Sequence, residues 1–231
     1  MQQIANAPAK SLVSIAIDAV RDYIRQQDLR VGDNLPGEGY FAEKLGVSRA
    51  VMREAFGALA ALKLIDVANG RRARVGALDG SVIAASLDHA ISTSQIKVAD
   101  VWDVRRTIEM RTAALAASNA TAAQAARIVA LAESMSHEDD ATDDDIEFHL
   151  AIAEASGNEL FFQIVASFVP LMRIAVPQAW STRRTPEERH EILDRHRKLA
   201  WAIANREPES ARQWMAAHFD ESIGALLADK R

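Results

Sequence analysis

Apolar side chains recur every three or four residues along most of the chain, which is the spacing of amphipathic helices rather than of strands. In the first third of the chain this spacing predicts helices over residues 11–28, around residues 41–45 and over residues 48–62. The buried face of the third of these helices is expected to carry Val51, Ala55, Leu59 and Leu62.

The periodicity changes over residues 64–75, where two short apolar runs flank Asn69 and Gly70. Asn-Gly between two such runs is a strong signal of a β-hairpin with a two-residue turn. Three helices followed by a hairpin form a winged helix-turn-helix, and we expect this domain over residues 1–77.

Residues 77–80 interrupt the pattern, and every element predicted after them is helical. The chain is therefore expected to be mainly α, with a second, all-helical domain over residues 78–231. The inward stripe of the first long helix in this domain is expected to include Val101, Val104 and Ile108. Helices are predicted over residues 81–91, 99–118, 122–135 and 186–205, around residues 145–153 and around residues 215–226.

Cysteine is absent from the 231 residues, which excludes disulfides, thiolate metal sites and thiol nucleophiles. The N-terminus lacks the charged start and apolar core of a signal peptide, and no apolar run reaches the roughly 18 residues of a membrane span. We therefore expect a cytoplasmic protein without a membrane partner.

The formal net charge of -5 is divided unevenly between the two predicted domains. Residues 1–77 contain 11 Lys and Arg against 8 Asp and Glu, whereas residues 78–231 contain 16 against 24. Within residues 49–74 there are six basic residues and only two acidic ones. A basic segment in the predicted winged helix favours contact with DNA phosphates, and the acidic remainder disfavours such contact elsewhere.

Two arginines stand at the start of the helix that follows Ser48, whose hydroxyl is suited to capping that helix. Arg49 and Arg53 are four residues apart, so their side chains share one face, and each guanidinium can bind a guanine edge or a phosphate. The alternative is a solvated arginine pair on an ordinary helix. Further charge at the hairpin tip is expected from Arg71, Arg72 and Arg74.

Three histidines lie among apolar residues on three different predicted helices. His149 shares one helix face with Asp145, while His196 and His218 lie on the apolar stripes of the last two helices. Three buried imidazoles would repel one another when protonated and leave ring nitrogens unpaired when neutral. A divalent cation bound by them and one carboxylate removes that cost, whereas the alternative is three hydrogen-bonded core histidines. The histidines on predicted loops or polar faces are His89, His137 and His190.

Arg105 and Asn158 are candidates for contact with a small ligand. Arg105 lies at the edge of an inward stripe, where it could bind a carboxylate at the mouth of a metal cavity or form a salt bridge with Glu109. Asn158 could cap the helix that follows it or donate a hydrogen bond to the ligand. No second inward acid or base is placed as a proton shuttle beside the histidines, which argues against a metal-dependent enzyme.

Four segments of the N-terminal domain form a recognisable set. They are Leu35-Pro36-Gly37-Glu38, Phe41-Ala42-Glu43-Lys44-Leu45-Gly46-Val47-Ser48-Arg49, Val51-Met52-Arg53-Glu54-Ala55 and Gly70-Arg71. Together they resemble the N-terminal domain of GntR-type bacterial transcription regulators, over residues 11–76. The resemblance implies operator contacts by Ser48, Arg49 and Arg53, and a wing that Gly70 allows to approach the DNA backbone.

Two positions depart from the GntR pattern. Many members have arginine where this chain has Gly39, and the usual glycine after Gly-Arg in the wing is Arg72 here. The first departure removes an expected DNA contact and the second adds a charge, so we expect the operator to differ from the commonest one.

The helical domain carries a second set of segments. They are Arg105 to Glu109, Leu115-Ala116-Ala117, Asp145 with Phe148-His149, Ser156-Gly157-Asn158, His196 and His218. This set resembles the FCD-type effector domain of the FadR subgroup of GntR regulators, over roughly residues 98–220. The resemblance implies an antiparallel helical bundle that binds a metal through Asp145, His149, His196 and His218. It also disfavours a fatty acyl-CoA effector, because acyl-CoA-binding members lack these histidines.

These inferences together predict a ligand-responsive transcription regulator that binds double-stranded operator DNA as a homodimer. We expect a repressor that leaves its operator when a small carboxylate binds the metal, Arg105 and Asn158. Zinc is the first choice of metal, with nickel and manganese as alternatives. The other functions considered are a metal-dependent enzyme acting on a small carboxylate and a bundle with a purely structural metal.

Overall fold

The computed structural model of the chain divides into two compact units, Met1–Asp79 and Gly80–Arg231, each with its own hydrophobic core. The structure describes residues 10–68, 70–136, 142–181 and 185–228, and for residues 221–228 it describes the backbone alone.

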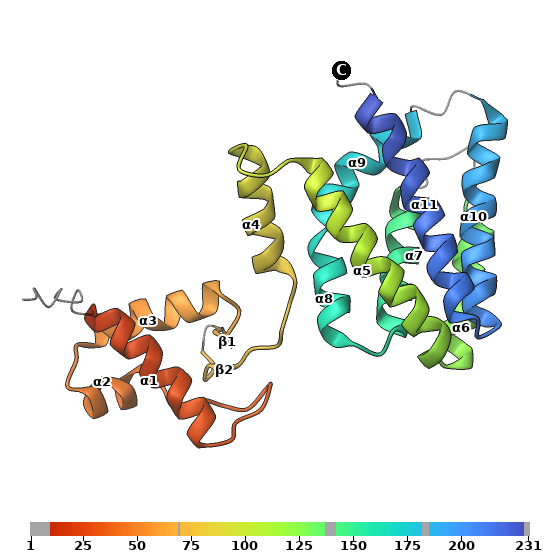
Figure 1. Cartoon of the computed structure of the whole chain (residues 1–231). Coiled ribbons are helices and arrows are strands. Elements are labelled where there is room, and N and C mark those ends of the chain that lie inside the picture. Colours follow the sequence, from red (N-terminus) through yellow and green to blue (C-terminus); the bar gives the residue numbers. More distant parts are fainter. Residues whose placement is uncertain (1–9, 69, 137–141, 182–184, 229–231) are drawn as a thin grey trace, which may run out of the picture. The chain divides into compact units, whose positions relative to one another are not determined.

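The described part of the N-terminal unit has three helices and a two-stranded antiparallel sheet, which confirms the predicted winged helix-turn-helix. Phe41 is at the aromatic centre of its core. The ring of Phe41 packs against the rings of Tyr23, Tyr40 and Phe56 at centroid distances of 5.3, 5.2 and 5.9 Å. The elements are α1 (Leu12–Gln26), α2 (Glu38–Leu45), α3 (Arg49–Ala61), β1 (Ile65–Asp66) and β2 (Arg74–Val75) (Figure 1).

Local hydrogen bonds form the turn between α2 and α3. Gly46 ends α2 with a φ of 66°, a left-handed conformation that glycine adopts without steric cost. The N–H of Val47 then donates to the carbonyl oxygen of Ala42 at 3.1 Å. Ser48 begins α3 as predicted, because its Oγ accepts a hydrogen bond from the N–H of Val51 at 3.3 Å.

The buried face of α3 matches the predicted one at Ala55 and Leu59, which are fully buried, but not at the other two positions. Val51 is only partly buried and Leu62, directly after the helix, is 51% exposed. Met52 and Phe56 occupy the core instead, because α3 packs against α1 and α2 at the same time. The opposite face of α3 is left to polar and small side chains.

The hairpin is present, and the N–H of Arg71 donates to the carbonyl oxygen of Ala68 at 3.2 Å, the bond expected across a two-residue turn at positions 69 and 70. The paired strands are shorter than predicted, since the ladder contains only Ile65 with Val75 and Asp66 with Arg74, and Asn69 lies outside the described residues. The strand β2 is also held from its other edge, where the N–H of Leu35 donates to the carbonyl oxygen of Ala73 at 2.8 Å. This distant partner fixes the position of the strand, which the local Asn-Gly signal could not reveal.

The C-terminal unit is the predicted helical bundle (Figure 1). Its longest helix, α5, packs against α7, α10 and α11, and α6 packs against α7 and α10. Helices α5 and α11 run antiparallel and are joined by an ion pair between Arg106 and Asp220 at 2.7 Å. The elements are α4 (Ser81–Ser92), α5 (Val98–Asn119), α6 (Ala122–Ser134), α7 (Thr142–Ala155), α8 (Glu159–Ser167), α9 (Val169–Ser181), α10 (Pro186–Ala204) and α11 (Pro208–Ala228).

Helix α8 is the helix expected after Asn158, whereas α9 is not among the predicted helices. Pro170 at the start of α9 and Pro177 inside it obscure the helical pattern of this segment. Across the described residues, no single helix has both the length and the apolar composition of a membrane span. Helices α8 and α9 have this length and composition only when they are taken together, and the chain bends by 57° between them.

The inner face of α5 matches the predicted apolar stripe only in part. Val101 is buried as expected, but Val104 is 49% exposed, and Arg105, Glu109 and Thr112 are each 1% exposed. Because α7, α8, α10 and α11 all pack against α5, its buried face is broad and includes these polar side chains.

Candidate metal centre and DNA-binding surface

The first turns of α3 present Arg49 and Arg53 on an exposed face. The side chain of Arg53 is 79% exposed, and its Nε lies 3.8 Å from Oε2 of Glu38 at the start of α2. Ser48 precedes both arginines, and its hydroxyl proton is able to donate to a phosphate because the cap uses only the oxygen as acceptor. A Cβ at Gly39 would lie 3.8 Å from Nη2 of Arg49, so glycine leaves space beside this guanidinium.

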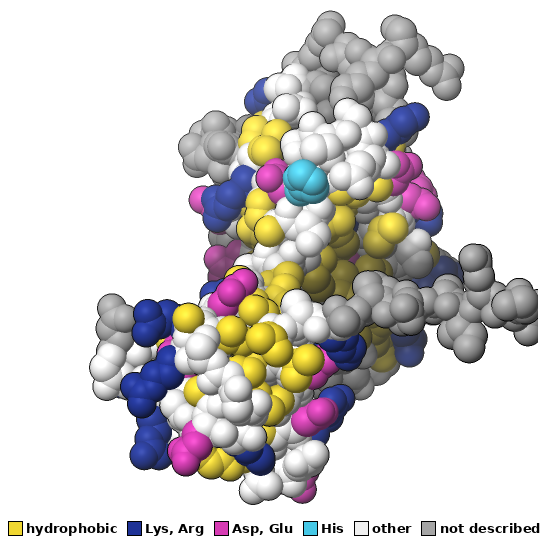
Figure 2. Space-filling view, turned by 90° about the vertical axis from the view of Figure 1, so that its left-hand side faces the viewer, with side chains coloured by type: hydrophobic (Ala, Val, Ile, Leu, Met, Phe, Trp, Pro, Cys, Tyr) yellow, Lys and Arg dark blue, Asp and Glu magenta, His cyan; other side chains and the backbone are white. Residues whose placement is uncertain are grey.

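The predicted wing residues lie mainly in the loop between β1 and β2. Gly70 has a φ of 74°, a backbone conformation that favours glycine, and Arg71 and Arg72 are exposed. Arg74 belongs to β2 rather than to the tip of the wing, and Asn69 lies outside the described residues. Figure 2 shows Lys and Arg side chains gathered along one edge of the N-terminal unit.

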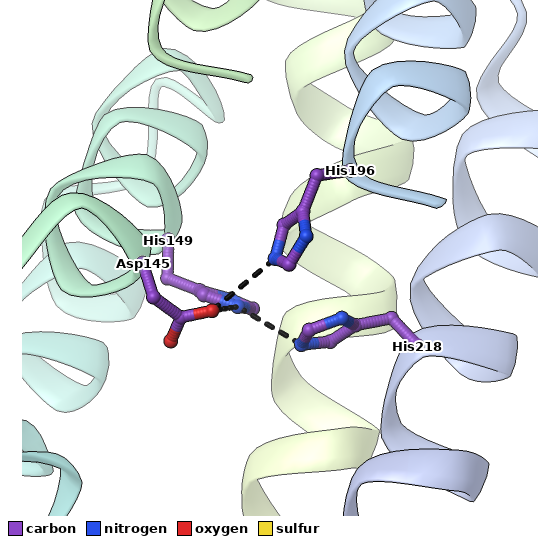
Figure 3. A group of neighbouring side chains, drawn as sticks. All are labelled: Asp145, His149, His196 and His218. Carbon is purple, nitrogen blue, oxygen red and sulfur yellow. Dashed lines mark hydrogen bonds and ion pairs between the residues drawn. The ribbon is translucent and has the colours of Figure 1, made fainter. Parts of the chain in front are cut away.

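The four predicted metal ligands converge inside the bundle from three helices (Figure 3). Asp145 and His149 lie one turn apart on α7, His196 lies on α10 and His218 on α11. One ligand atom from each lies within 4.8 Å of the others. Nε2 of His149 is 3.2 Å from Nε2 of His218, and Nε2 of His196 is 3.2 Å from Oδ1 of Asp145. Of the remaining histidines, His89 and His190 are exposed and His137 lies outside the described residues.

Outer hydrogen bonds determine which ring nitrogens face this cluster. Nδ1 of His149 donates to Oε2 of Glu109, and Nδ1 of His196 donates to the carbonyl oxygen of Ile192 at 3.0 Å. Because a carboxylate and a carbonyl only accept, we assign the protons to these Nδ1 atoms, and both Nε2 lone pairs then face the centre. Outer hydrogen bonds of this kind orient the imidazoles of protein metal sites.

Glu109 is a residue of the site that the sequence did not reveal beyond a possible pairing with Arg105. Its carboxylate is 1% exposed and accepts hydrogen bonds from Nε of Arg105 at 2.9 Å and from Nδ1 of His149. Glu109 is thus a second inward acid beside the histidines, although its hydrogen bonds to Arg105 and His149 do not place it as a proton shuttle. The available signal was the spacing of four residues from Arg105, but the predicted apolar stripe placed Val104 and Ile108 inward instead.

Neighbouring charges keep both carboxylates ionised. Burial alone would raise the pKa of Asp145, but His149 and His196 lower it well below its ordinary value. Burial would likewise raise the pKa of Glu109, and Arg105 together with His149 lowers it. Both groups are therefore anionic at neutral pH, as a cation ligand and its supporting residue require.

The histidines differ from one another in their affinity for protons. Burial, together with the charges of His196 and His149, lowers the pKa of His218 well below its ordinary value. Burial also acts to lower the pKa of His149, but Glu109 and Asp145 raise it overall. His218 therefore offers a neutral ring nitrogen at neutral pH, whereas His149 binds a proton more readily than an ordinary histidine, so protons compete with a cation mainly at His149.

The chemistry and spacing of these donors fit a divalent transition metal. Nitrogen atoms that each bind the same ion at about 2 Å lie roughly 3 Å apart, and the two closest separations in the cluster are both 3.2 Å. Two lone pairs at this separation repel each other unless a proton or a cation lies between them. Three imidazoles and one carboxylate could hold zinc, nickel or manganese.

Arg105 lies inside the bundle and not at the mouth of a cavity, which corrects the predicted position. Its Nε forms the buried salt bridge with Glu109, so the considered alternative is present in the structure. The guanidinium carbon lies 4.6 Å from the ring centroid of Trp102 and 5.1 Å from that of Phe219. In the part of the chain that the structure describes, no acceptor bonds to Nη1 or Nη2, so these donors can still bind an anion.

Asn158 acts as the N-cap of α8. Its Oδ1 accepts from the backbone N–H groups of Leu160 at 3.0 Å and Phe161 at 3.3 Å, and the residue is exposed. The structure thus shows the capping alternative, and the side-chain oxygen is already in use.

Replacing Glu109 with glutamine is expected to weaken metal binding by about 10- to 100-fold, the usual effect of removing an outer partner of a ligating histidine. Glutamine keeps the shape of the side chain but loses the charge that holds the Nδ1 proton of His149. Calorimetric titration of the metal-free chain with Zn²⁺ measures the effect. Glu147→Gln on the exposed face of α7 is the matched control, and equal Zn²⁺ affinities of the two variants would exclude a role for Glu109 in orienting His149.

Both units match known protein families. Residues 12–75 match the family described as bacterial regulatory proteins, gntR family, and residues 100–221 match the FCD domain. The two matches include α3 with its arginines and all four residues of the metal cluster.

Individual relatives are similar over most of the chain. The Glc operon transcriptional activator of Escherichia coli strain K12 is 30% identical over 225 residues, covering 93% of this chain and 85% of the relative. The HTH-type transcriptional repressor NanR of Salmonella newport is 28% identical over 221 residues, covering 91% and 84%. The solved structure of Streptococcus agalactiae GntR is 24% identical, covers 90% of this chain and 97% of that one, and has the same fold with a TM-score of 0.62.

Proposed function

Since the chain belongs to the gntR family of bacterial regulatory proteins and carries an FCD domain, it is a DNA-binding transcription regulator, and we propose that a small carboxylate controls its binding to DNA. In this proposal the carboxylate binds in the bundle beside a divalent metal held by Asp145, His149, His196 and His218. Binding releases a homodimeric repressor from its operator.

The convergence of three imidazoles and one carboxylate inside the bundle is the observation that carries this proposal. Zinc is our first choice of ion, and nickel and manganese suit the same donors. When bound, the ion supplies a Lewis-acid centre that attracts a ligand oxygen. The bundle therefore has a means of recognising a small oxygen-bearing molecule in its interior.

The buried charges indicate that this molecule is an anion. The carboxylates of Asp145 and Glu109 and the guanidinium of Arg105 have a net charge of -1. With a divalent ion bound, the net charge of the site becomes +1. A monocarboxylate would neutralise the site, whereas an uncompensated buried charge is costly. The Nη groups of Arg105 are suited to bind its oxygens. We leave Asn158 out of this site because its side-chain oxygen caps α8.

In this proposal, α3 and the wing are the elements that contact DNA. In a homodimer, two α3 helices would enter successive major grooves of a pseudo-palindromic operator. A carboxylate that binds better to a domain arrangement unsuited to DNA lowers DNA affinity, and a coupling of about 1–3 kcal/mol suffices. The proposed DNA contacts are made by Ser48, Arg49, Arg53, Gly70, Arg71 and Arg72.

The contacts of Glu109 support a regulator rather than a metal-dependent enzyme. This acid is already bonded to Arg105 and His149, so it is not placed to exchange a proton with a substrate. We choose repression over activation because release from an operator requires no contact with a further protein. One relative is named an activator and another a repressor, so in vitro transcription with and without the ligand tests this choice.

DNA binding by the metal-loaded protein tests the proposal as a whole. A binding sequence is first selected from random DNA. The affinity of the metal-loaded protein for this DNA is then measured by fluorescence anisotropy, without a carboxylate and with lactate, citrate, gluconate or benzoate present. We expect at least one of them to weaken binding by about 5- to 150-fold, and removal of the metal by a chelator to abolish this effect. Release that persists without metal would contradict the role of the ion, and conversion of the carboxylate into a product would favour the enzyme.

A further inference from the structure

A buried hydrogen-bond donor without a partner lies next to the proposed ligand site. The side chain of Trp102 on α5 is almost fully buried, and within the described residues its Nε1 has no acceptor. Burying an N–H group without an acceptor costs about 1–3 kcal/mol. Buried tryptophans usually have a partner for this group. The orphaned N–H therefore requires an explanation.

Arg105 follows Trp102 by three residues on α5, so the two side chains lie on the same inner face of the helix. The guanidinium carbon of Arg105 is 4.6 Å from the indole centroid, and the ring of Phe219 lies 5.8 Å from the indole. The ring of Phe219 is in turn 5.9 Å from that of His149, one of the proposed metal ligands. The indole of Trp102 thus lies beside the guanidinium of Arg105, and the ring of Phe219 connects it with the metal cluster.

We propose that Trp102 is a ligand-binding residue whose Nε1 donates a hydrogen bond to the carboxylate that Arg105 binds. The inference rests on the proposed function. It adds the neutral N–H donor of Trp102 to the charged guanidinium of Arg105. The carboxylate satisfies the buried Nε1 of Trp102, which has no acceptor within the described residues, and it can also accept from the Nη groups of Arg105. A further oxygen of the ligand remains for the metal.

Among the residues that the structure describes, no acceptor bonds to Nε1 of Trp102. Glu109, four residues after Arg105 on α5, already accepts from Nε of Arg105 and from His149. The ring of Phe219 and the guanidinium of Arg105 also lie against the indole, and neither contains an acceptor oxygen. A ligand oxygen is thus the partner that this environment lacks.

Two replacements separate the hydrogen bond of Trp102 from its packing. Phenylalanine keeps an aromatic ring at the position but removes the N–H. Incorporation of 3-benzothienylalanine keeps the bicyclic shape and places sulfur where the N–H stood, so the core is expected to fold as before. Trp201→Phe on α10 is the matched control, because Trp201 is 59% exposed.

Calorimetric titration of the full-length, zinc-loaded protein with lactate, citrate, gluconate and benzoate tests the inference. For each carboxylate that binds, we expect both Trp102 variants to bind it about 10-fold more weakly, the effect of one hydrogen bond to a charged group. The affinity for Zn²⁺ alone and the affinity of the Trp201 variant for the carboxylate should stay unchanged.

The possible failures of this experiment are distinguishable. Equal carboxylate affinities of the wild type and both Trp102 variants would refute the role of Trp102 while leaving the proposed function intact. The absence of metal-dependent binding of any of the four carboxylates to the wild type would refute the proposed function and this inference with it. An equal loss in the Trp201 variant would overturn the assignment to Trp102.

Discussion

Replacing Arg53 with alanine is expected to lower the affinity for operator DNA by about 100-fold, and replacing Arg49 to have a similar effect. A guanidinium that binds a guanine edge contributes about 1–3 kcal/mol, and a homodimer loses two such contacts at once. Both arginines stand exposed on the first turns of α3, outside the core, so the fold should remain intact. Fluorescence anisotropy with the selected operator measures the loss.

Arg21→Ala provides the matched control, because this arginine is exposed on α1 in the same unit. We expect it to leave specific DNA binding nearly unchanged. The metal affinity of the Arg49 and Arg53 variants should equal that of the wild type, since the ligands belong to the other unit. Operator binding at full strength in both arginine variants would exclude α3 as the recognition helix.

The second large effect is expected at His196. Replacing it with alanine should weaken Zn²⁺ binding by at least about 100-fold, since loss of a direct ligand exceeds the 10- to 100-fold effect of losing an outer partner. The imidazole is held ready for a cation, because Nδ1 bonds to the carbonyl oxygen of Ile192 and Nε2 lies 3.2 Å from Oδ1 of Asp145. Carboxylate affinity should fall in parallel, because the ligand is proposed to bind the ion.

His190→Ala is the control for this variant, since His190 is exposed on the same helix α10. In calorimetric titrations with Zn²⁺ and then with the carboxylate, we expect both affinities to fall in the His196 variant and to stay unchanged in the His190 variant. Circular dichroism of the His196 variant and of the chelated wild type should show unchanged helix content, whereas unfolding would identify the metal as structural. Unchanged carboxylate affinity in the His196 variant would reject a direct role of the ion.

Features encoded by neighbouring residues could be predicted from the sequence. The helix-turn-helix depends on Gly46 and Ser48, whose conformation and capping are local properties. Asp145 and His149 were identifiable because a spacing of four residues places two side chains on one helix face. His196 and His218 were identifiable because polar residues on apolar stripes require partners.

Features that depend on distant contacts could not be predicted. The residues before α2 pair with β2 from its other edge, through the bridge between Asn34 and Arg74, and no local turn signal reveals this pairing. The sequence places Arg105 at the edge of an inward stripe, and only the packing of α7, α8, α10 and α11 around α5 shows that Arg105 and Glu109 are fully buried as a pair. Trp102 draws attention only when the missing partner of its N–H is known.

The affinity for the carboxylate, measured with and without operator DNA, tests most directly whether the metal site controls α3. Coupling between two binding sites is reciprocal, so a ligand that weakens DNA binding must itself bind less tightly to the DNA complex. We expect the zinc-loaded protein saturated with operator to bind the carboxylate about 5- to 150-fold more weakly than the free protein. Equal affinities in the two states would contradict the control of DNA binding by the bundle.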